Sequence, residues 1–361
     1  MRPRRVPESS LYKSGVADDF AGSANRRQRF SFLGRLGTVR LVCVTRAGPL
    51  TSRMVLAQCI PKPTPMSNQG LLTGCGAVVS GGSRGIGRAV AELLGDLGAG
   101  VVVNGRDADA VRETVTAITA PGGQATSVVG AADDERIATA LVEECTRTYG
   151  RLNILINCAG IAEPTGSSIL NISSEEFDRL ISVHLGTAFH TCRIAARVMA
   201  AQGHGAIINT SSVAFLGDYG GTGYPAGKGA VNGLTMAIAA ELKAYGVRAN
   251  VVCPGARTRL STGVEYEKHI EDLHRRGLLD EMTMRASLDS AAPAFVAPLY
   301  AYLASDLARD VTGQIFVAAG GFVGSFDRPT PRVLGYRDHH DGEPWSVADV
   351  HKMISAAATN R

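Results

Sequence analysis

The sequence has no uninterrupted apolar run long enough to cross a membrane. A membrane helix needs about 18 or more such residues, and the most apolar candidate, residues 41–60, is interrupted by Arg46 and Arg53. Met1 is also not followed by the apolar stretch that a secretory signal carries. We therefore expect no membrane partner and no secretory signal.

Cysteines are few and follow no pattern. The chain has 7, an odd number without a Cys-x-x-Cys pair, which is not how a disulfide framework is spaced. Cys75, Cys158 and Cys253 lie in apolar runs, where a free thiol behaves as a small core residue. Because free thiols are typical of a reducing compartment, we predict a cytoplasmic location. The chain also lacks His-Glu-x-x-His and any clustered set of Cys and His ligands, so no metal is predicted.

An excess of basic charge is confined to one end of the chain. Residues 1–65 hold 12 Lys and Arg against 3 Asp and Glu, whereas the remainder holds 25 against 30. A mildly acidic remainder offers no extended basic surface, so we expect no nucleic-acid partner. The overall content of 45% hydrophobic and 19% charged residues is ordinary for a globular protein.

Residues 1–65 show no sustained hydrophobic period and end in the sequence Pro-Lys-Pro-Thr-Pro. An Arg-rich, acid-poor leader is typical of organelle-targeting segments. The alternatives are that the protein starts at Met66, or that the stretch is a tail without structure. We treat it as a basic, disordered N-terminal extension. Residues 66–325 then form the catalytic domain, and residues 326–361 form a C-terminal extension that could cover the substrate pocket or a neighbouring subunit.

From residue 75 onward, short apolar runs alternate with amphipathic segments. The predicted strands are residues 77–80, 100–104, 126–129, 154–157, 206–210, 248–252 and 314–318. The predicted helices include residues 87–97, 135–149, 174–201 and 230–245. Apolar strands separated by helices are typical of a parallel sheet covered on both faces. We predict an α/β fold, a Rossmann-like doubly wound parallel sheet of seven strands, with ligands bound beyond the carboxyl ends of the strands.

A glycine-rich segment follows the first of these strands. Residues 80–87 read Ser-Gly-Gly-Ser-Arg-Gly-Ile-Gly. Glycine permits a tight turn and lets backbone N–H groups approach a pyrophosphate closely. A helix beginning near Ile86 would point its partially positive end at the phosphates. The segment therefore predicts a dinucleotide site.

A second segment has the residues needed to move a proton. Tyr224 and Lys228 are four positions apart, so on a helix they share one face. The unperturbed pKa of tyrosine, about 10, is poorly matched to neutral pH, and a nearby cation lowers it. A serine on an adjacent loop, Ser211 or Ser212, could orient a carbonyl oxygen and stabilise developing charge.

Together the two segments resemble the short-chain dehydrogenase/reductase family. Its TGxxxGxG pattern is matched with Ser80 in place of Thr, its YxxxK pattern is matched at Tyr224 and Lys228, and the resemblance extends over residues 74–322. It implies an NAD(P)(H)-dependent enzyme that interconverts a secondary alcohol and a ketone. A 3-oxoacyl thioester is the first substrate expected and a steroid-like ketone the second. The resemblance also implies a homo-oligomer, either dimer or tetramer.

The resemblance assigns roles to the catalytic residues. Tyr224 would be the general acid/base, and Lys228 would lower its pKa and bind the ribose. Counting from the strand start selects Ser212 as the catalytic serine, whereas the family's usual spacing to tyrosine selects Ser211. We favour Ser212, because a slipped β-strand would turn every side chain to the opposite face. His184 stands where the family has an Asn. It could carry a relay proton, or it could simply hold a backbone carbonyl.

Cofactor preference depends on the end of the second strand. An acid there binds the ribose of NAD, and an Arg suits the 2′-phosphate of NADP. Gly105 stands at the acid's position and Arg106 follows, with Arg84 as a second cation. We predict NADP(H), while Asp107 keeps NAD(H) open. The predicted cofactor-binding set is Ser80, Gly81, Ser83, Arg84, Gly85, Ile86, Gly87, Arg106, Asn157, Ala159, Gly160, Tyr224, Lys228, Pro254, Gly255 and Thr258.

Three positions depart from the family pattern. Cys158 replaces the second Asn of the family's NNAG segment, Ala131 stands where an acid contacts adenine, and His184 replaces Asn. These departures suggest an alternative hypothesis, a non-catalytic dinucleotide-binding scaffold or regulator. Residues 259–292 are expected to form a lid over the substrate, whose His269 and His274 would be solvated helix residues.

Overall fold

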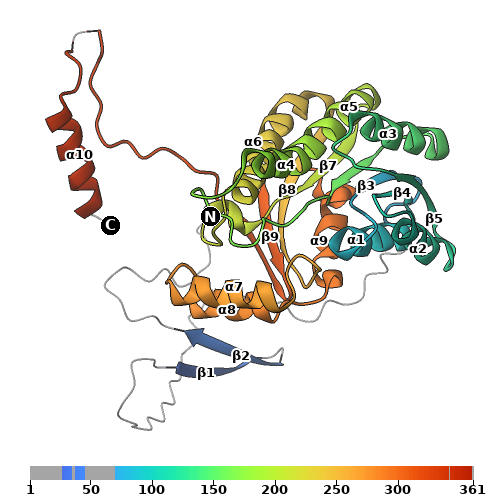
Figure 1. The fold of residues 1–361 in the computed structure, drawn as a ribbon, viewed down its shortest axis with the longest axis horizontal. Coiled ribbons are helices and arrows are strands. Elements are labelled where there is room, and N and C mark those ends of the chain that lie inside the picture. The colour runs from blue at the N-terminus through green and yellow to red at the C-terminus, as the bar shows by residue number, and fades with distance from the viewer. Residues whose placement is uncertain (1–26, 35–36, 45–69, 341, 360–361) are drawn as a thin grey trace, which may run out of the picture. The chain divides into compact units, whose positions relative to one another are not determined.

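The computed structural model describes residues 27–34, 37–44, 70–340 and 342–359 (Figure 1). The chain divides into two compact units, Ser67–Thr330 on the one hand and Met1–Met66 with Pro331–Arg361 on the other. Within the described ranges, no helix is long and apolar enough to cross a membrane.

The larger unit is built on an eight-stranded sheet with the order β10-β9-β8-β7-β6-β3-β4-β5. Neighbouring strands are parallel except β10, which runs antiparallel to β9. The strands are β3 (Gly76–Ser80), β4 (Gly100–Gly105), β5 (Gln124–Val129), β6 (Ile154–Asn157), β7 (Gly205–Thr210), β8 (Val247–Gly255), β9 (Ile315–Ala319) and β10 (Phe322–Phe326).

Helices cover both faces of this sheet (Figure 1). Successive strand residues point to opposite faces, so Val79 packs with residues of α1, α2 and α9, whereas Val78 packs with residues of α3, α5 and α6. The helices are α1 (Gly85–Asp96), α2 (Ala108–Thr119), α3 (Glu135–Tyr149), α4 (Ser174–Ile181), α5 (Thr187–Gln202), α6 (Gly223–Leu242), α7 (Val264–Arg275), α8 (Glu281–Leu288) and α9 (Ala297–Ala304). The predicted doubly wound α/β fold is confirmed, and each of the seven predicted strands is present.

The eighth strand was not expected. β10 turns back on β9 through Gly320 and Gly321, with Ala319 paired to Phe322, and Gly320 has a positive φ of 54°. A two-residue Gly-Gly connection is a known hairpin signal. The sequence does not indicate this strand, because Phe322 and Val323 are both exposed and the strand lacks an alternating pattern of buried apolar residues.

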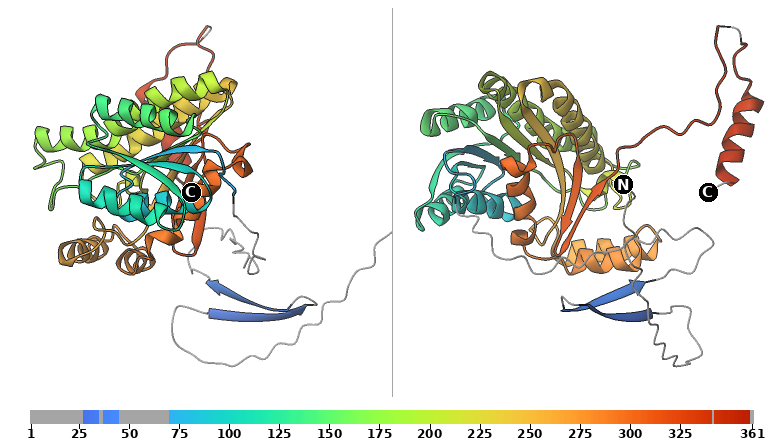
Figure 2. Two further views of the ribbon diagram at one scale, coloured as in Figure 1. Left: turned by 90° about the vertical axis from the view of Figure 1, so that its right-hand side faces the viewer. Right: turned by 180° about the vertical axis from the view of Figure 1, so that it is seen from behind.

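The predicted helix 174–201 is divided by a π-helical turn, Ser182–Gly186, which separates α4 from α5. Such a turn adds a residue to the helical repeat and is frequent at functional sites. It carries the buried His184. The predicted lid is a pair of helices, α7 and α8, seen side by side in Figure 2. Ile270 and Leu273 of α7 cluster with Leu279 and Met284.

The smaller unit contains an antiparallel strand pair and a helix. β1 (Arg27–Gly34) pairs with β2 (Gly37–Val44), which the sequence did not lead us to expect. The rest of residues 1–65 lies outside the described residues, so the predicted disorder there stays a prediction. Near the other terminus, α10 (Val347–Thr359) follows a segment in which the Arg337 guanidinium lies 4.0 Å from the ring centroid of Trp345.

Candidate active site

The glycine-rich loop packs closely against the segment that follows β6. A Cβ added at Gly81 would lie 2.5 Å from the backbone nitrogen of Ala159, and one added at Gly87 would lie 2.2 Å from the carbonyl oxygen of Gly81. Both positions therefore require glycine. The same loop reaches the segment after β8, since a Cβ at Gly85 would lie 3.4 Å from Thr258 Cγ2. Pro254 and Gly255 end β8, so these predicted cofactor residues meet at one edge of the sheet.

The first turn of α1 is open to an anion. Its N-cap residue, Arg84, forms no side-chain cap bond, and the turn contains no acidic residue. The N–H groups of a first helical turn lack partners within the helix and are suited to phosphate. Ile86 instead turns its side chain into the core, beside Ala256 and Val296. The backbone of this turn, rather than the Ile86 side chain, is the part that fits a cofactor phosphate.

Two predicted cofactor residues use their side chains to join strands. The Ser80 hydroxyl donates to Asn157 Oδ1 at 2.8 Å, and Asn157 Nδ2 donates to Asn209 Oδ1 at 2.8 Å. Thr191 also donates to Asn157 Oδ1, at 3.0 Å. All four residues are buried. Ser80 and Asn157 therefore fix the ends of β3, β6 and β7, and their side chains are occupied there.

The end of β4 has no room for an acidic side chain at Gly105. A Cβ there would lie 2.3 Å from Ser83 Oγ. Arg106 is exposed, and Arg84 Nη2 lies 2.6 Å from Asp107 Oδ2. Asp107 also caps α2 by accepting from the Ala110 N–H. That bond and the Arg84 guanidinium lower the pKa of Asp107. The Asp107 carboxylate is thus already engaged by its own chain.

Tyr224 and Lys228 lie on one face of α6, with Lys228 Nζ 5.6 Å from the centroid of the tyrosine ring. Lys228 is buried and its Nζ donates to the carbonyl oxygen of Thr210 at 3.0 Å. Burial lowers the pKa of Lys228 to about 8. Burial raises the pKa of Tyr224, while a hydrogen bond with the Ser212 side chain lowers it. Here the Lys228 ammonium points to a backbone carbonyl, and Ser212 is the group that favours the phenolate.

The two adjacent serines face different ways. Ser211 is buried, and its hydroxyl donates to the backbone carbonyl of Lys228 at 3.0 Å. Ser212 accepts from the Ala214 N–H at 3.1 Å and bonds to the Tyr224 side chain. Ser211 therefore anchors α6, and the Ser212 hydroxyl lies beside the tyrosine.

His184 lies against the same tyrosine. The two rings meet edge to face, with centroids 5.0 Å apart. His184 Nε2 lies 3.1 Å from the carbonyl oxygen of Ile161, so it carries the hydrogen and donates, while Nδ1 is buried without a partner. Burial and the Lys228 charge lower the pKa of His184 to about 2. A Cβ at Gly160 would lie 3.4 Å from Nδ1 and 3.7 Å from Lys228 Nζ, so this glycine leaves space between the two.

Sequence reasoning missed two residues that support this site. Glu163 accepts hydrogen bonds from backbone N–H groups at the start of α6, among them that of Tyr224. Tyr300 of α9 is fully buried and its hydroxyl lies 2.9 Å from Thr210 Oγ1. Both act across long sequence separations, and no local motif marks them.

A family model described as enoyl-(acyl carrier protein) reductase matches residues 81–323, more than half of the chain. The chain belongs to the short-chain dehydrogenase/reductase family. Members of this family are NAD(P)-dependent oxidoreductases of alcohol and ketone groups, and that general activity holds for this chain.

Relatives within the short-chain dehydrogenase/reductase family cover most of the larger unit. A hydroxyacyl-CoA dehydrogenase of Mycobacterium tuberculosis is 35% identical over 298 residues, which are 77% of this chain and 87% of that protein. A 3α-hydroxysteroid dehydrogenase of Mediterraneibacter gnavus is 33% identical over 247 residues, 68% of this chain and 95% of that protein. The crystal structure of a short-chain dehydrogenase from Mycobacterium avium matches with a TM-score of 0.65 and 33% identity, over 80% of this chain and 95% of that chain.

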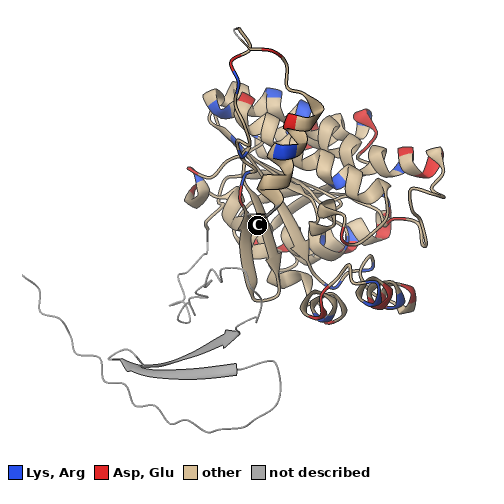
Figure 3. Ribbon diagram, turned by 90° about the vertical axis from the view of Figure 1, so that its left-hand side faces the viewer, with Lys and Arg blue, Asp and Glu red and all other residues tan. Residues whose placement is uncertain are grey.

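In this short-chain dehydrogenase/reductase, α7 and α8 carry charges of both signs (Figure 3). Their basic residues are largely paired within the helix, as in Lys268 with Glu265 and Arg275 with Asp272. His269 and His274 are not simply solvated, since His269 donates to the carbonyl oxygen of Tyr219 at 3.1 Å and His274 to that of Leu279 at 2.9 Å. The first bond joins α7 to the loop before α6, and the second closes the turn between α7 and α8.

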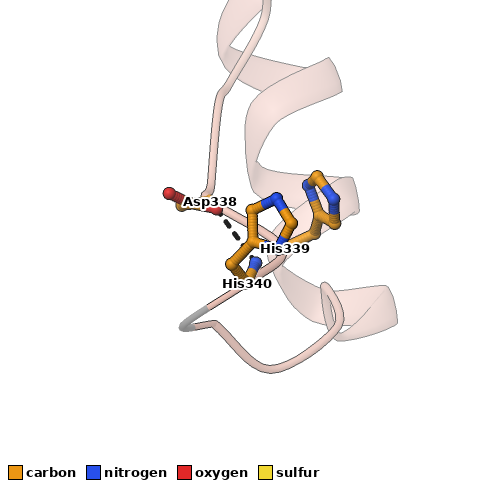
Figure 4. Close-up of side chains that lie close together, drawn as sticks. All are labelled: Asp338, His339 and His340. Atoms are coloured by element: carbon orange, nitrogen blue, oxygen red, sulfur yellow. Dashed lines mark hydrogen bonds between the residues drawn. The ribbon is translucent and has the colours of Figure 1, made fainter.

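The C-terminal segment brings three candidate ligand atoms together. Asp338, His339 and His340 offer a carboxylate oxygen and two ring nitrogens within 4.8 Å of one another (Figure 4). All three residues are exposed, and the His340 N–H donates to Asp338 Oδ1 at 2.9 Å. Exposed groups of this kind are common without an ion, so we assign no metal to them.

Proposed function

We propose that this enzyme interconverts a secondary alcohol and a ketone by hydride transfer with NADP(H), with Tyr224 as the general acid/base. The observation that carries the proposal is the joint placement of Ser212 and Lys228 about Tyr224 on the edge of the sheet where the glycine loop lies. When bound, the nicotinamide supplies or accepts the hydride. Side chains of this protein transfer the proton and hold the substrate oxygen.

Tyr224 is suited to donate a proton at neutral pH. Because burial raises its pKa, the phenol keeps its proton and can pass it to the alkoxide formed during reduction. The Ser212 hydroxyl lies beside the phenol and can hold the substrate oxygen in place. In alcohol oxidation the phenolate is needed instead, and the Ser212 hydrogen bond favours it.

Lys228 and His184 lie against the Tyr224 ring and assist its proton transfer without contacting the substrate oxygen. The His184 ring stays neutral because its pKa is about 2, and its Nε2 hydrogen is directed to the Ile161 carbonyl, which cannot take the proton up. The sequence-based idea that His184 carries a relay proton is therefore replaced by a narrower one. Its Nδ1, which has no partner among the described residues, is available to accept a hydrogen bond from a group held between it and Lys228.

The preference for NADP(H) is supported by the charges at the end of β4. Arg106 is exposed and forms no ion pair with an acid among the described residues, so it is available to a phosphate. Ser83 fills the space that an acid at position 105 would need. Asp107, which kept NAD(H) open, is engaged by Arg84 and by the N-terminus of α2.

A 3-oxoacyl thioester is the substrate that we propose first, and the relative described as a hydroxyacyl-CoA dehydrogenase supports this choice. A steroid-like ketone is the second, supported by the 3α-hydroxysteroid dehydrogenase. We also propose a homo-oligomer, as the family resemblance implies. A cytoplasmic location stays a prediction, supported by the free thiols of Cys75, Cys145, Cys158, Cys192 and Cys253.

The test is a substrate screen combined with one substitution. Acetoacetyl-CoA, cyclohexanone and a 3-oxosteroid would be offered with NADPH, and its consumption followed by absorbance. We expect turnover of at least one compound, and we expect Tyr224→Phe to abolish turnover while NADPH still binds. If NADPH binds but no carbonyl compound in the screen is reduced, the hypothesis of a non-catalytic dinucleotide-binding scaffold is favoured over the proposed enzyme.

A further inference from the structure

The start of α6 is capped by a carboxylate from a distant part of the chain. Glu163 Oε1 accepts from the Thr222 N–H at 2.9 Å and from the Gly223 N–H at 3.2 Å. Glu163 Oε2 accepts from the N–H of Tyr224 itself. Thr222, the N-cap residue, supplies no side-chain cap bond of its own. One side chain, from the loop after β6, therefore satisfies three backbone donors of the catalytic helix.

The surroundings are shaped to hold this carboxylate. The Ser167 hydroxyl donates to Glu163 Oε1 at 2.9 Å. Gly221 has a φ of 76°, and a Cβ there would lie 2.9 Å from Glu163 Cδ. A side chain at position 221 would displace the carboxylate. Bonds from N–H groups to a carboxylate are stronger than neutral ones, and a negative charge is favourable at a helix N-terminus.

The loop that carries Glu163 also holds the histidine of the site. The carbonyl oxygen of Ile161 accepts from His184 Nε2, two residues before Glu163. The loop thus contacts the backbone of Tyr224 on one side and the ring that packs against Tyr224 on the other.

We propose that Glu163 is a positioning residue for the acid/base Tyr224, acting by capping α6 from the loop after β6. The inference rests on the proposed function. Glu163 touches the tyrosine only through its backbone, so its effect is on the placement of the phenol and on the charge at the helix end. The cap offsets the positive end of α6 and thereby opposes formation of the phenolate.

Several groups face Tyr224 and must be considered in any pH experiment. Lys228 of α6, His184 of the π-turn and Ser212 lie against it. Cys253 of β8 and Tyr266 of α7 interact with it electrostatically. Loss of the Glu163 charge would disfavour the protonated forms of both Tyr224 and Lys228. Both pKa values would therefore move downward together.

The experiment compares Glu163→Gln with Glu176→Gln. Glu176 is the matched control, because it completes the capping box of α4 with Ser173, a helix that bears no catalytic residue. The compound reduced fastest in the substrate screen is used. For Glu163→Gln we expect kcat to fall about tenfold or more, with NADPH affinity measured by fluorescence unchanged. The rising limb of alcohol oxidation against pH should move down by about half a pH unit.

Glu176→Gln should lose thermal stability but keep kcat within about twofold of wild type and leave the pH profile in place. The inference is overturned if Glu163→Gln leaves both kcat and the profile unchanged, or if both variants lose kcat equally. If Glu163→Gln does not fold, Ser167→Ala is the variant that tests the inference. It removes one hydrogen bond to the Glu163 carboxylate and leaves the carboxylate itself in place. Ser167→Ala should lower kcat without moving the pH profile, and an unchanged kcat would overturn the inference.

Wild type and Tyr224→Phe are assayed in parallel. Absence of turnover by wild type, or retained turnover by Tyr224→Phe, overturns the proposed function itself. Active wild type and inactive Tyr224→Phe, together with an unaffected Glu163→Gln, overturn the Glu163 inference alone.

Discussion

The Ser211 hydroxyl donates to the backbone carbonyl of Lys228, 3.0 Å away, while Lys228 Nζ donates to the carbonyl oxygen of Thr210. Two consecutive residues at the end of β7 therefore hold the lysine, one at its backbone and one at its amine. The next residue, Ser212, is left beside Tyr224. Ser211 thus anchors the lysine, and Ser212 is the serine that lies beside Tyr224 for the proposed reaction.

Separate substitutions of the two serines should give different results. Ser212→Ala removes the hydroxyl beside Tyr224, so we expect kcat to fall about 100-fold with little change in thermal stability. Ser211→Ala leaves that hydroxyl in place but loses a buried hydrogen bond, which costs about 1 kcal/mol of unfolding free energy. Steady-state kinetics and denaturant melts of both variants check this division. A larger loss of kcat in Ser211→Ala would reverse the assignment.

Arg106→Asp should change the cofactor preference. An exposed guanidinium at the end of β4 favours a 2′-phosphate, and a carboxylate in its place would repel it. We expect NADPH affinity to fall at least tenfold and NADH affinity to change little, measured by titration of cofactor fluorescence. Arg112→Asp, on the exposed side of α2 where it pairs with Asp109, controls for overall charge. Equal losses for both cofactors would contradict the role of Arg106.

His184→Asn should retain activity within about tenfold of wild type. An amide can donate to the Ile161 carbonyl and offer an acceptor oxygen in place of Nδ1, whereas His184→Leu can do neither and should lose more. Because the pKa of His184 is about 2, the ring is neutral above that value and adds no charge change between pH 5 and 7. The reduction rate of wild type should show no histidine titration in that range. A step there that disappears in His184→Asn would show that the ring does change charge.

Alcohol oxidation should become faster as the pH rises above neutrality. Oxidation needs the Tyr224 phenolate, and burial raises the pKa of this phenol above its usual 10, so the protonated form dominates at neutral pH. Ser212 lowers that pKa through its hydrogen bond. The rising limb should therefore move to higher pH in Ser212→Ala. Initial rates from pH 6 to 10 test this, and a pH-independent rate would exclude Tyr224 as the base.

Sequence patterns predicted those parts of the molecule that depend on local spacing. The strands from Gly76 to Ala319 are short apolar runs, and the four-residue spacing of Tyr224 and Lys228 places them on one helical face. Counting along the strand favoured Ser212 over Ser211 as the catalytic serine, but only the fold shows that Ser211 Oγ turns to the Lys228 carbonyl. Such a bond spans 17 positions and leaves no periodic signal.

Features that depend on packing between distant segments could not be predicted. The π-turn at Ser182–Gly186 lies inside a stretch predicted as one continuous helix, because a single extra residue in the helical repeat does not break the sequence pattern. Glu163 accepts a hydrogen bond from the Tyr224 N–H, which lies 61 positions further along the chain. The direction of Lys228 Nζ, towards Thr210 rather than the phenol, follows from burial of the amine and its need for an acceptor.

Ser83 and Gly105 compete for one small volume, since a Cβ on the glycine would lie 2.3 Å from the serine oxygen. An acid introduced at position 105 alone would therefore have to displace the Ser83 side chain. Any redesign of the ribose site towards an acidic residue has to change positions 83 and 105 together, because neither position can be altered independently of the other.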